Sequence, residues 1–196
     1  MAVVDATVDP RPQLARALDQ VEHQIAELRP HDFGRSTPCA EYDARTLLAH
    51  LVAVLRKLEV VRHGGDMTQV NDPATDLHGD EDAAFRHART AFERAWEADS
   101  ALGPDYTLAW GTMPGRALLD AYTHEFTVHA WDLSQVTGRG DDLDPVLAHA
   151  ALDWFSRNVP AEDRSEDGPF APVVAIANDA GPYARLAAFV GRQAAL

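Results

Sequence analysis

The feature that most limits how this chain can fold is a pair of polar residues on an otherwise apolar helical face. Between residues 116 and 137, apolar side chains recur every three or four positions, which predicts a helix. Glu125 and His129 lie four residues apart, so both project from that face, roughly 40° from each other. Burying an unpaired carboxylate there is costly. A partner must therefore reach Glu125 from another part of the fold.

The sequence around Glu125 approaches the zinc-protease motif HExxH without matching it. His124 and Glu125 supply the first two residues, but Val128 stands where the second histidine should be. His124 and His129 are about 140° apart on a helix, so they point in different directions. We therefore expect no metalloprotease. We expect His124 on the solvated flank and Glu125 as a metal ligand rather than a general base.

Composition indicates an ordinary globular protein. The 196 residues are 46% hydrophobic, which suits one domain over residues 1–196. The formal net charge is −14 and no segment concentrates Lys and Arg, which argues against partners such as nucleic acids or anionic membranes. Cys39 is the single cysteine, so an intrachain disulfide is excluded. With no signal-peptide pattern and no long apolar run, we expect a cytoplasmic protein.

The apolar periodicity predicts five long helices and a short terminal one. They span about residues 10–29, 43–62, 80–98, 116–137, 144–158 and 183–190. Asp43 is a good N-cap, and Gly138 is a stop signal. Residues 104–115 favour an extended segment or turn, and one short strand is expected at 173–176. We predict an all-α fold, an antiparallel four-helix bundle with additional C-terminal helices and at most a short strand pair.

A third candidate metal ligand lies on another predicted helix. His50 falls about two turns into the helix at 43–62, at the margin of its apolar face. Sites in bundles are built by facing helices near mid-height, so His50 can meet Glu125 and His129. Two imidazoles and one carboxylate leave a fourth position open, as in catalytic zinc sites, although nickel or iron suits the same ligands. The alternative is that His50 is a satisfied core histidine and Glu125 pairs with an arginine such as Arg45.

Other polar residues allow either a binding role or a structural one. Asp132 lies about 20° from Glu125 on the helical wheel. It can orient a ligating histidine, bind a substrate group, or serve as a surface or capping residue. Arg45 and Arg116 are candidates for holding an anionic substrate, and the alternative is a solvated arginine. Cys39 has no histidine beside it in sequence, which favours a small buried residue over a nucleophile.

Segments from three parts of the chain resemble one family. Residues 36–51, STPCAEYDARTLLAHL, resemble the TPCxxWDxxxLxxH segment in the metal-binding domain of mycothiol-dependent maleylpyruvate isomerases and their actinobacterial relatives. Residues 125–133, EFTVHAWDL, are similar to that family's ExxxHxWDLxxATG block. Residues 185–192, RLAAFVGR, are similar to its RLLxxxGR ending. The sequence departs from the first motif at Tyr42, where the family has tryptophan.

The resemblance implies a DinB-like fold, in which a four-helix bundle holds a divalent metal whose open position receives a thiol. It implies that the metal ligands of the family are carried over to His50, Glu125 and His129. It also implies mycothiol as a cosubstrate. The isomerase of this family has a second domain that helps to bind substrate, so the identity of the substrate does not transfer to this chain.

Two classes of function are open. In the first, the metal lowers the pKa of a small thiol, which then reacts with an electrophilic substrate in a transfer, conjugation or isomerisation. In the second, the metal centre serves structure or sensing without catalysis. The number of protein ligands distinguishes the two, because a fourth ligand, for which Asp132 and His124 are the candidates, would close the site. The sequence also leaves open a homodimer.

Overall fold

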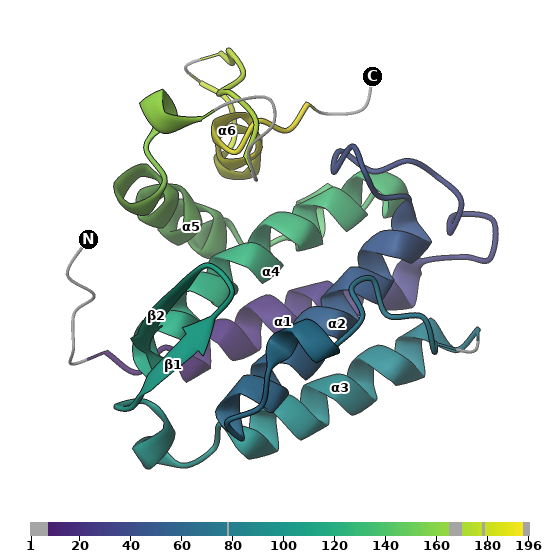
Figure 1. Ribbon diagram of the computed structural model, residues 1–196. Helices are drawn as coiled ribbons and strands as arrows, with labels where there is room; N and C mark the ends of the chain where they lie inside the picture. Colours follow the sequence, from purple (N-terminus) through teal and green to yellow (C-terminus); the bar gives the residue numbers. More distant parts are fainter. Residues whose placement is uncertain (1–7, 78, 165–169, 178, 194–196) are drawn as a thin grey trace.

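The described part of the chain is mainly helical. The computed structural model describes residues 8–77, 79–164, 170–177 and 179–193, and these form six α-helices and one two-stranded sheet (Figure 1). The helices are α1 (Arg11–Glu27), α2 (Ala44–Arg62), α3 (Glu81–Ala95), α4 (Gly115–Thr137), α5 (Pro145–Asn158) and α6 (Pro182–Phe189). The strands are β1 (Asp105–Leu108) and β2 (Gly111–Pro114). Within these described residues, no helix combines the length and apolar character needed to cross a membrane.

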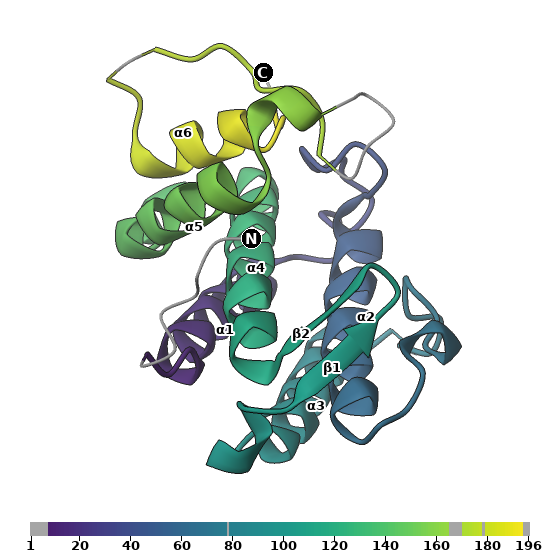
Figure 2. The ribbon, with the colours of Figure 1, turned by 60° about the vertical axis from the view of Figure 1, so that its left-hand side comes forward.

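Four of the helices form a bundle. α1 packs mainly along α4 and α2 mainly along α3, and the two pairs share one apolar core. α5 lies against α4, and α6 lies on α5 (Figures 1 and 2). All four bundle helices contribute fully buried side chains, among them Leu18, Leu51, Phe85 and Leu118. The predicted all-α bundle, with additional C-terminal helices and a short strand pair, is confirmed.

Local sequence signals set the ends of α2 and α4. The Asp43 side chain accepts a hydrogen bond of 2.8 Å from the backbone N–H of Thr46, which satisfies one of the free donors at the start of α2. Gly138 ends α4 with a φ of +73°, a left-handed conformation that glycine adopts without steric cost. Both residues act at the helix ends that the sequence predicts.

The extended segment predicted before α4 is a β-hairpin. β1 and β2 pair in antiparallel register, with Tyr106 opposite Met113. Tyr106 is buried, and its ring centroid lies 4.9 Å from that of Trp96. Its hydroxyl donates a hydrogen bond of 3.1 Å to the Ala101 carbonyl. The hairpin contacts both α2 and α4, so it lies across the two helices that carry the candidate ligands (Figure 2).

His124 does not lie on a solvated flank, so that prediction is wrong. Its side chain is almost fully buried, and its ring centroid lies 5.1 Å from that of Trp154 in α5. The helical wheel of one segment shows which residues share a face, but it cannot show that a later helix covers the polar flank. The packing of α5 on α4 therefore buries a residue that local periodicity leaves outside.

The strand predicted at residues 173–176 does not form, and that prediction is also wrong. Residues 171–177 have no regular secondary structure. The Val174 N–H donates a hydrogen bond of 2.9 Å to the carbonyl of Ala188 in α6, so the neighbour of this segment is a helix. A strand is stabilised by pairing with another strand along its length, and β-branched residues alone do not supply that partner.

The junction between the hairpin and α4 offers a test of the packing. A Cβ atom added at Gly115 would overlap the Ala101 carbonyl oxygen, 2.9 Å from the Tyr106 ring and 3.0 Å from the Trp96 ring. Backbone and two buried rings cannot move aside cheaply, so we expect Gly115→Ala to lower the free energy of unfolding by about 1–3 kcal/mol.

Urea unfolding followed by circular dichroism measures this loss. Gly103→Ala is the control, because a Cβ atom there meets no atom within 4 Å. We expect the control to change stability by less than about 0.5 kcal/mol. Equal stability of Gly115→Ala and the wild type would mean that the hairpin does not pack against α4 as described.

Candidate metal centre

α2 and α4 bring together the three residues that the sequence suggests as metal ligands. His50, Glu125 and His129 each place one ligand atom within 4.8 Å of the other two. Glu125 Oε1 lies 3.4 Å from His50 Nε2 and 3.2 Å from His129 Nε2. The two imidazole rings meet edge to face, with centroids 5.2 Å apart. One carboxylate oxygen is therefore shared between imidazoles from two helices.

These spacings suit a tetrahedral ion. Ligand atoms bonded to zinc at about 2.0–2.2 Å lie roughly 3.3–3.6 Å apart when the geometry is tetrahedral. The two N···O separations of 3.2 and 3.4 Å are close to that range. Two imidazoles and one carboxylate also match the donor set of catalytic zinc sites, in which one position is left for water or substrate. The residues present therefore fit a divalent metal.

The outer nitrogen of each histidine is held by a carboxylate. His50 Nδ1 lies 2.8 Å from Asp72 Oδ1, and His129 Nδ1 lies 2.9 Å from Asp132 Oδ2. An ionised carboxylate only accepts hydrogen bonds, so each Nδ1 must carry the proton and donate it. A neutral ring with its proton on Nδ1 has a lone pair on Nε2. Both Nε2 lone pairs are therefore directed toward Glu125.

Protons are drawn to this cluster when no other cation neutralises it. Burial opposes a charged His129, but the charge of Glu125 and the hydrogen bonds with Asp132 and Glu125 outweigh it and raise the pKa of His129 to about 9. Burial likewise opposes a charged His50, yet its hydrogen bonds with Asp72 and Glu125 raise its pKa. Burial would raise the pKa of Glu125, but the charge of His129 and hydrogen bonds from both histidines lower it. The cluster therefore stabilises positive charge, whether on its histidines or on a bound cation.

Access to the cluster is uneven. The side chain of His129 is 5% exposed, that of His50 is 13% exposed and that of Glu125 is 29% exposed. The ring of Tyr42 packs on His50 with a centroid separation of 5.3 Å. A small molecule can therefore approach from the side of the carboxylate, while the imidazole of His129 is enclosed by protein.

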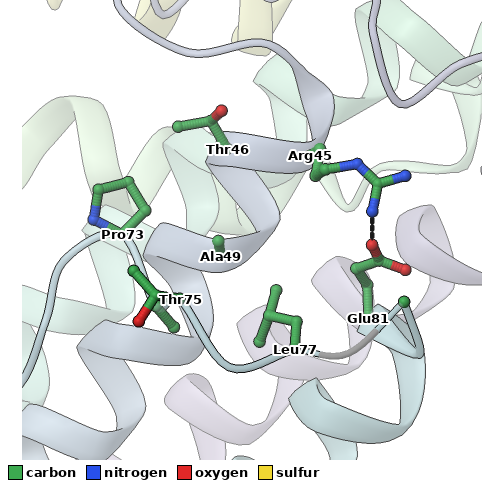
Figure 3. Close-up of a pocket in the computed structure, with 9 residues that line it drawn as sticks. Arg45, Thr46, Ala49, Pro73, Thr75, Leu77 and Glu81 are labelled. Carbon is green, nitrogen blue, oxygen red and sulfur yellow. Dashed lines mark ion pairs between the residues drawn. The ribbon is translucent and has the colours of Figure 1, made fainter.

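Two cavities lie beside the loop that follows α2. One, of about 350 Å³, is lined by Lys57 of α2, by residues of that loop such as Asp72, and by Ala109 between the hairpin strands. The other, of about 400 Å³, lies between α2, the loop and the start of α3 (Figure 3). Figure 3 shows Arg45 and Glu81 paired at its edge. Neither cavity includes the three clustered side chains in its lining, but Asp72 joins the first cavity to His50.

The two arginines considered from the sequence lie elsewhere. Arg45 forms an ion pair with Glu81, and its guanidinium lies 4.6 Å from the centre of the Phe33 ring. The alternative that Arg45 neutralises Glu125 is therefore wrong, because two histidines occupy that role. Arg116 donates a hydrogen bond to the Val8 carbonyl. Both arginines are held by protein partners outside the cluster.

Cys39 lies nearer to the cluster than its sequence context suggests. Its sulfur belongs to a second group of neighbouring ligand atoms, with His129 and Asp132. The side chain is half-buried, and burial raises the pKa of its thiol to about 11. The thiol is therefore protonated at neutral pH, which does not suit a nucleophile. Asp132 is fully buried and also forms an ion pair with Arg192, whose Nε lies 3.3 Å from Oδ1.

Sequence reasoning missed Asp72, Lys57 and Arg192. Asp72 lies in a polar segment without hydrophobic period, so no pattern placed it beside His50. Lys57 follows His50 by seven residues on α2 and therefore shares its helical face, a spacing that sequence alone could have revealed. Arg192 lies in the terminal segment that resembles the family ending, but its partner Asp132 could not be deduced from that resemblance.

The sequence of this chain is similar to one protein family and to two curated proteins. Residues 14–134 match the family model described as the mycothiol maleylpyruvate isomerase N-terminal domain. Two curated proteins of Mycobacterium tuberculosis, uncharacterized proteins of strains CDC 1551 / Oshkosh and ATCC 25618 / H37Rv, are each 29% identical over 185 residues. The aligned region covers 94% of this chain and 98% of each relative.

Two solved structures share the fold. The crystal structure of the mycothiol-dependent maleylpyruvate isomerase aligns with a TM-score of 0.52 and 17% identity, over 76% of this chain and 72% of that one. A histidine-to-alanine mutant of that enzyme aligns with the same TM-score and coverage at 16% identity. At this identity the likeness establishes the DinB-like helical fold alone. Because the family model matches more than half of the sequence, the chain belongs to the mycothiol maleylpyruvate isomerase N-terminal domain family.

Proposed function

We propose that this protein is a metal-dependent enzyme that uses a low-molecular-weight thiol such as mycothiol. His50, Glu125 and His129 hold one divalent ion, for which zinc suits the donor set best and nickel or iron are alternatives. When bound, this ion would lower the pKa of the thiol and make thiolate available near neutral pH for an electrophilic substrate. The reaction is a transfer or a thiol-assisted isomerisation.

The observation that carries this proposal is the convergence of three electron-pair donors on one point. Asp72 and Asp132 each accept a hydrogen bond from a histidine Nδ1–H. A neutral imidazole with its proton on Nδ1 has no proton on Nε2 to donate to Glu125. With neutral rings, the Glu125 oxygen lies 3.4 Å and 3.2 Å from two Nε2 lone pairs that repel it, unless a metal ion or added protons supply positive charge. A divalent ion satisfies all three at once, whereas protons satisfy them only by charging the buried rings.

The arrangement favours an open site over a closed one. Asp132 and His124 are the fourth-ligand candidates from the sequence, and Cys39 groups with His129 and Asp132 but not with all three clustered residues. Asp132 lies on the Nδ1 side of His129, and His124 is buried against Trp154. Neither belongs to the three-residue group. The fourth position is therefore left to water or a ligand, which supports catalysis rather than a purely structural or sensing role.

The protein's own residues orient and enclose the site. Asp132 holds the His129 ring and is itself held by Arg192. The partial exposure of Glu125 leaves one approach for a thiol and its electrophile. The family relationship supports the choice of thiol, because the solved relative is named as a mycothiol-dependent isomerase. The electrophile is not inferred from that relative, since the likeness extends to the fold alone.

We expect the purified protein to hold about one divalent ion per chain. His129→Ala should weaken the affinity by more than the 10- to 100-fold typical of losing a ligand's hydrogen-bond partner, because it removes a ligand itself. Elemental analysis gives the occupancy, and competition with a chromophoric chelator gives the affinity. His87→Ala, an exposed histidine of α3, is the matched control and should leave both unchanged. Full occupancy in His129→Ala together with loss in His124→Ala would assign the ligand to the other histidine.

We further expect mycothiol to bind more tightly to the metal-loaded protein than to the metal-free protein. Thiolate is a softer and stronger zinc ligand than water, so the gain should depend on sulfur. Calorimetric titration compares the two forms, with the hydroxyl analogue of the thiol as the matched ligand control. Turnover on a panel of electrophiles should survive Cys39→Ala, whose thiol is protonated, but not His50→Ala.

Equal thiol affinity with and without metal, or equal affinity for thiol and hydroxyl analogue, would exclude direct ligation of sulfur. Metal-dependent thiol binding without turnover on any electrophile would leave the non-catalytic alternative as the better account.

A further inference from the structure

Asp72 contacts the candidate centre from outside every motif noted in the sequence. Its Oδ1 atom accepts a hydrogen bond of 2.8 Å from His50 Nδ1, across 22 residues of chain. We infer that Asp72 is a positioning residue that fixes the tautomer and the ring orientation of His50. Its effect on metal affinity rests on the proposed function, whereas its effect on the tautomer does not.

The tautomer of His50 is decided by competition between two carboxylates. A neutral imidazole has one proton, which either Nδ1 donates to Asp72 or Nε2 donates to Glu125. The Asp72 contact is 2.8 Å long and the Glu125 contact is 3.4 Å long. The shorter bond is the stronger one, so the proton resides on Nδ1 and the Nε2 lone pair is free for a ligand. Without Asp72, the proton moves to Nε2 and blocks that position.

The carboxylate is itself fixed in place. Lys57 Nζ donates a hydrogen bond of 2.6 Å to Asp72 Oδ2, and both side chains are mostly buried. Lys57 lies two turns after His50, so one face of α2 presents both groups to the same carboxylate. Two residues further along the loop, the Ala74 N–H donates to the carbonyl of Ala49 at 3.1 Å. This backbone bond fastens the loop to α2 at the residue before His50.

Each of the two clustered histidines donates a hydrogen bond from Nδ1 to an aspartate, but the two aspartates come from different kinds of segment. His129 takes its carboxylate from Asp132, three residues later on the same helix, and Arg192 balances that charge. His50 takes Asp72 from a separate loop, and Lys57 balances it. The orientation of His129 is thus built into α4, whereas that of His50 depends on how the loop after α2 is seated.

Two measurements on the 196-residue chain test the role of Asp72. The first is the tautomer of His50 in metal-free protein, read from ¹⁵N–¹H correlation spectra at a pH at which the ring is neutral. We expect the Nδ1–H form in the wild type and the Nε2–H form in Asp72→Ala. The second is Zn²⁺ affinity, for which we expect a loss of about 10- to 100-fold in Asp72→Ala.

Two further variants separate positioning from general damage to the loop. Asp72→Asn keeps the size and one acceptor oxygen, so its affinity should lie between those of the wild type and Asp72→Ala. Asp76→Asn is the matched control, because this loop carboxylate pairs with Arg56 at 2.6 Å and belongs to a different ion pair. We expect the control to keep the Nδ1–H form of His50 and a Zn²⁺ affinity within about twofold of the wild type.

Each result bears on one proposal or the other. An unchanged tautomer and unchanged affinity in Asp72→Ala would overturn the positioning role, even if the variant melts at a lower temperature. A wild type that binds neither Zn²⁺ nor Ni²⁺ nor Fe²⁺ would refute the metal centre, while the tautomer measurement would still decide whether Asp72 fixes His50. A switched tautomer with a weakened Zn²⁺ affinity supports both.

Discussion

The structure is organised around the partly exposed carboxylate of Glu125, which lies between imidazoles from two helices. The buried residues of α4 are mainly apolar, with Thr123, His124, Thr127, Asp132 and Ser134 as polar exceptions besides His129, so the fold has to bring partners to the Glu125 carboxylate. It does so twice, with His129 one turn away on α4 and His50 across the bundle on α2. The arrangement only works because the far side of each ring is fixed by a further carboxylate. The contact between Glu125 and the two histidines depends on three placements. These are the packing of α2 against α4, the position of the loop after α2, and the position of the C-terminal segment.

Polar groups surround the Glu125 carboxylate in successive layers. From the centre outward come the carboxylate of Glu125, the two imidazoles, the carboxylates of Asp72 and Asp132, and the cations Lys57 and Arg192. Lys57 balances the charge of Asp72 and Arg192 balances that of Asp132, so these two inner carboxylates are not left without a partner. Such layering allows an acidic protein of net charge −14 to keep an ionised cluster inside its bundle.

The sequence carries most of the fold because helices are local structures. Residues close together in sequence determine the apolar spacing, the Asp43 cap and the Gly138 stop. They also determine that Glu125 and His129 share one helical face. Contacts between segments that are distant in sequence cannot be predicted from local sequence patterns. His124 is buried by α5 and Asp72 reaches His50 from a loop without periodicity, so neither could be predicted from its surroundings. The segment 173–176 has the composition of a strand but pairs with no strand in the described part of the chain.

The bundle consists of two helix pairs, α1 with α4 and α2 with α3, and the clustered side chains lie where the pairs meet. His50 and Glu125 are separated by 75 residues of chain. An ion held between them, as proposed, would join the two helix pairs only in the folded protein, because its ligands come from both pairs and do not meet in the unfolded chain. Under that proposal, occupation of the centre and docking of the two halves would be coupled equilibria, so the resistance of this protein to unfolding would depend on the concentration of free ion around it.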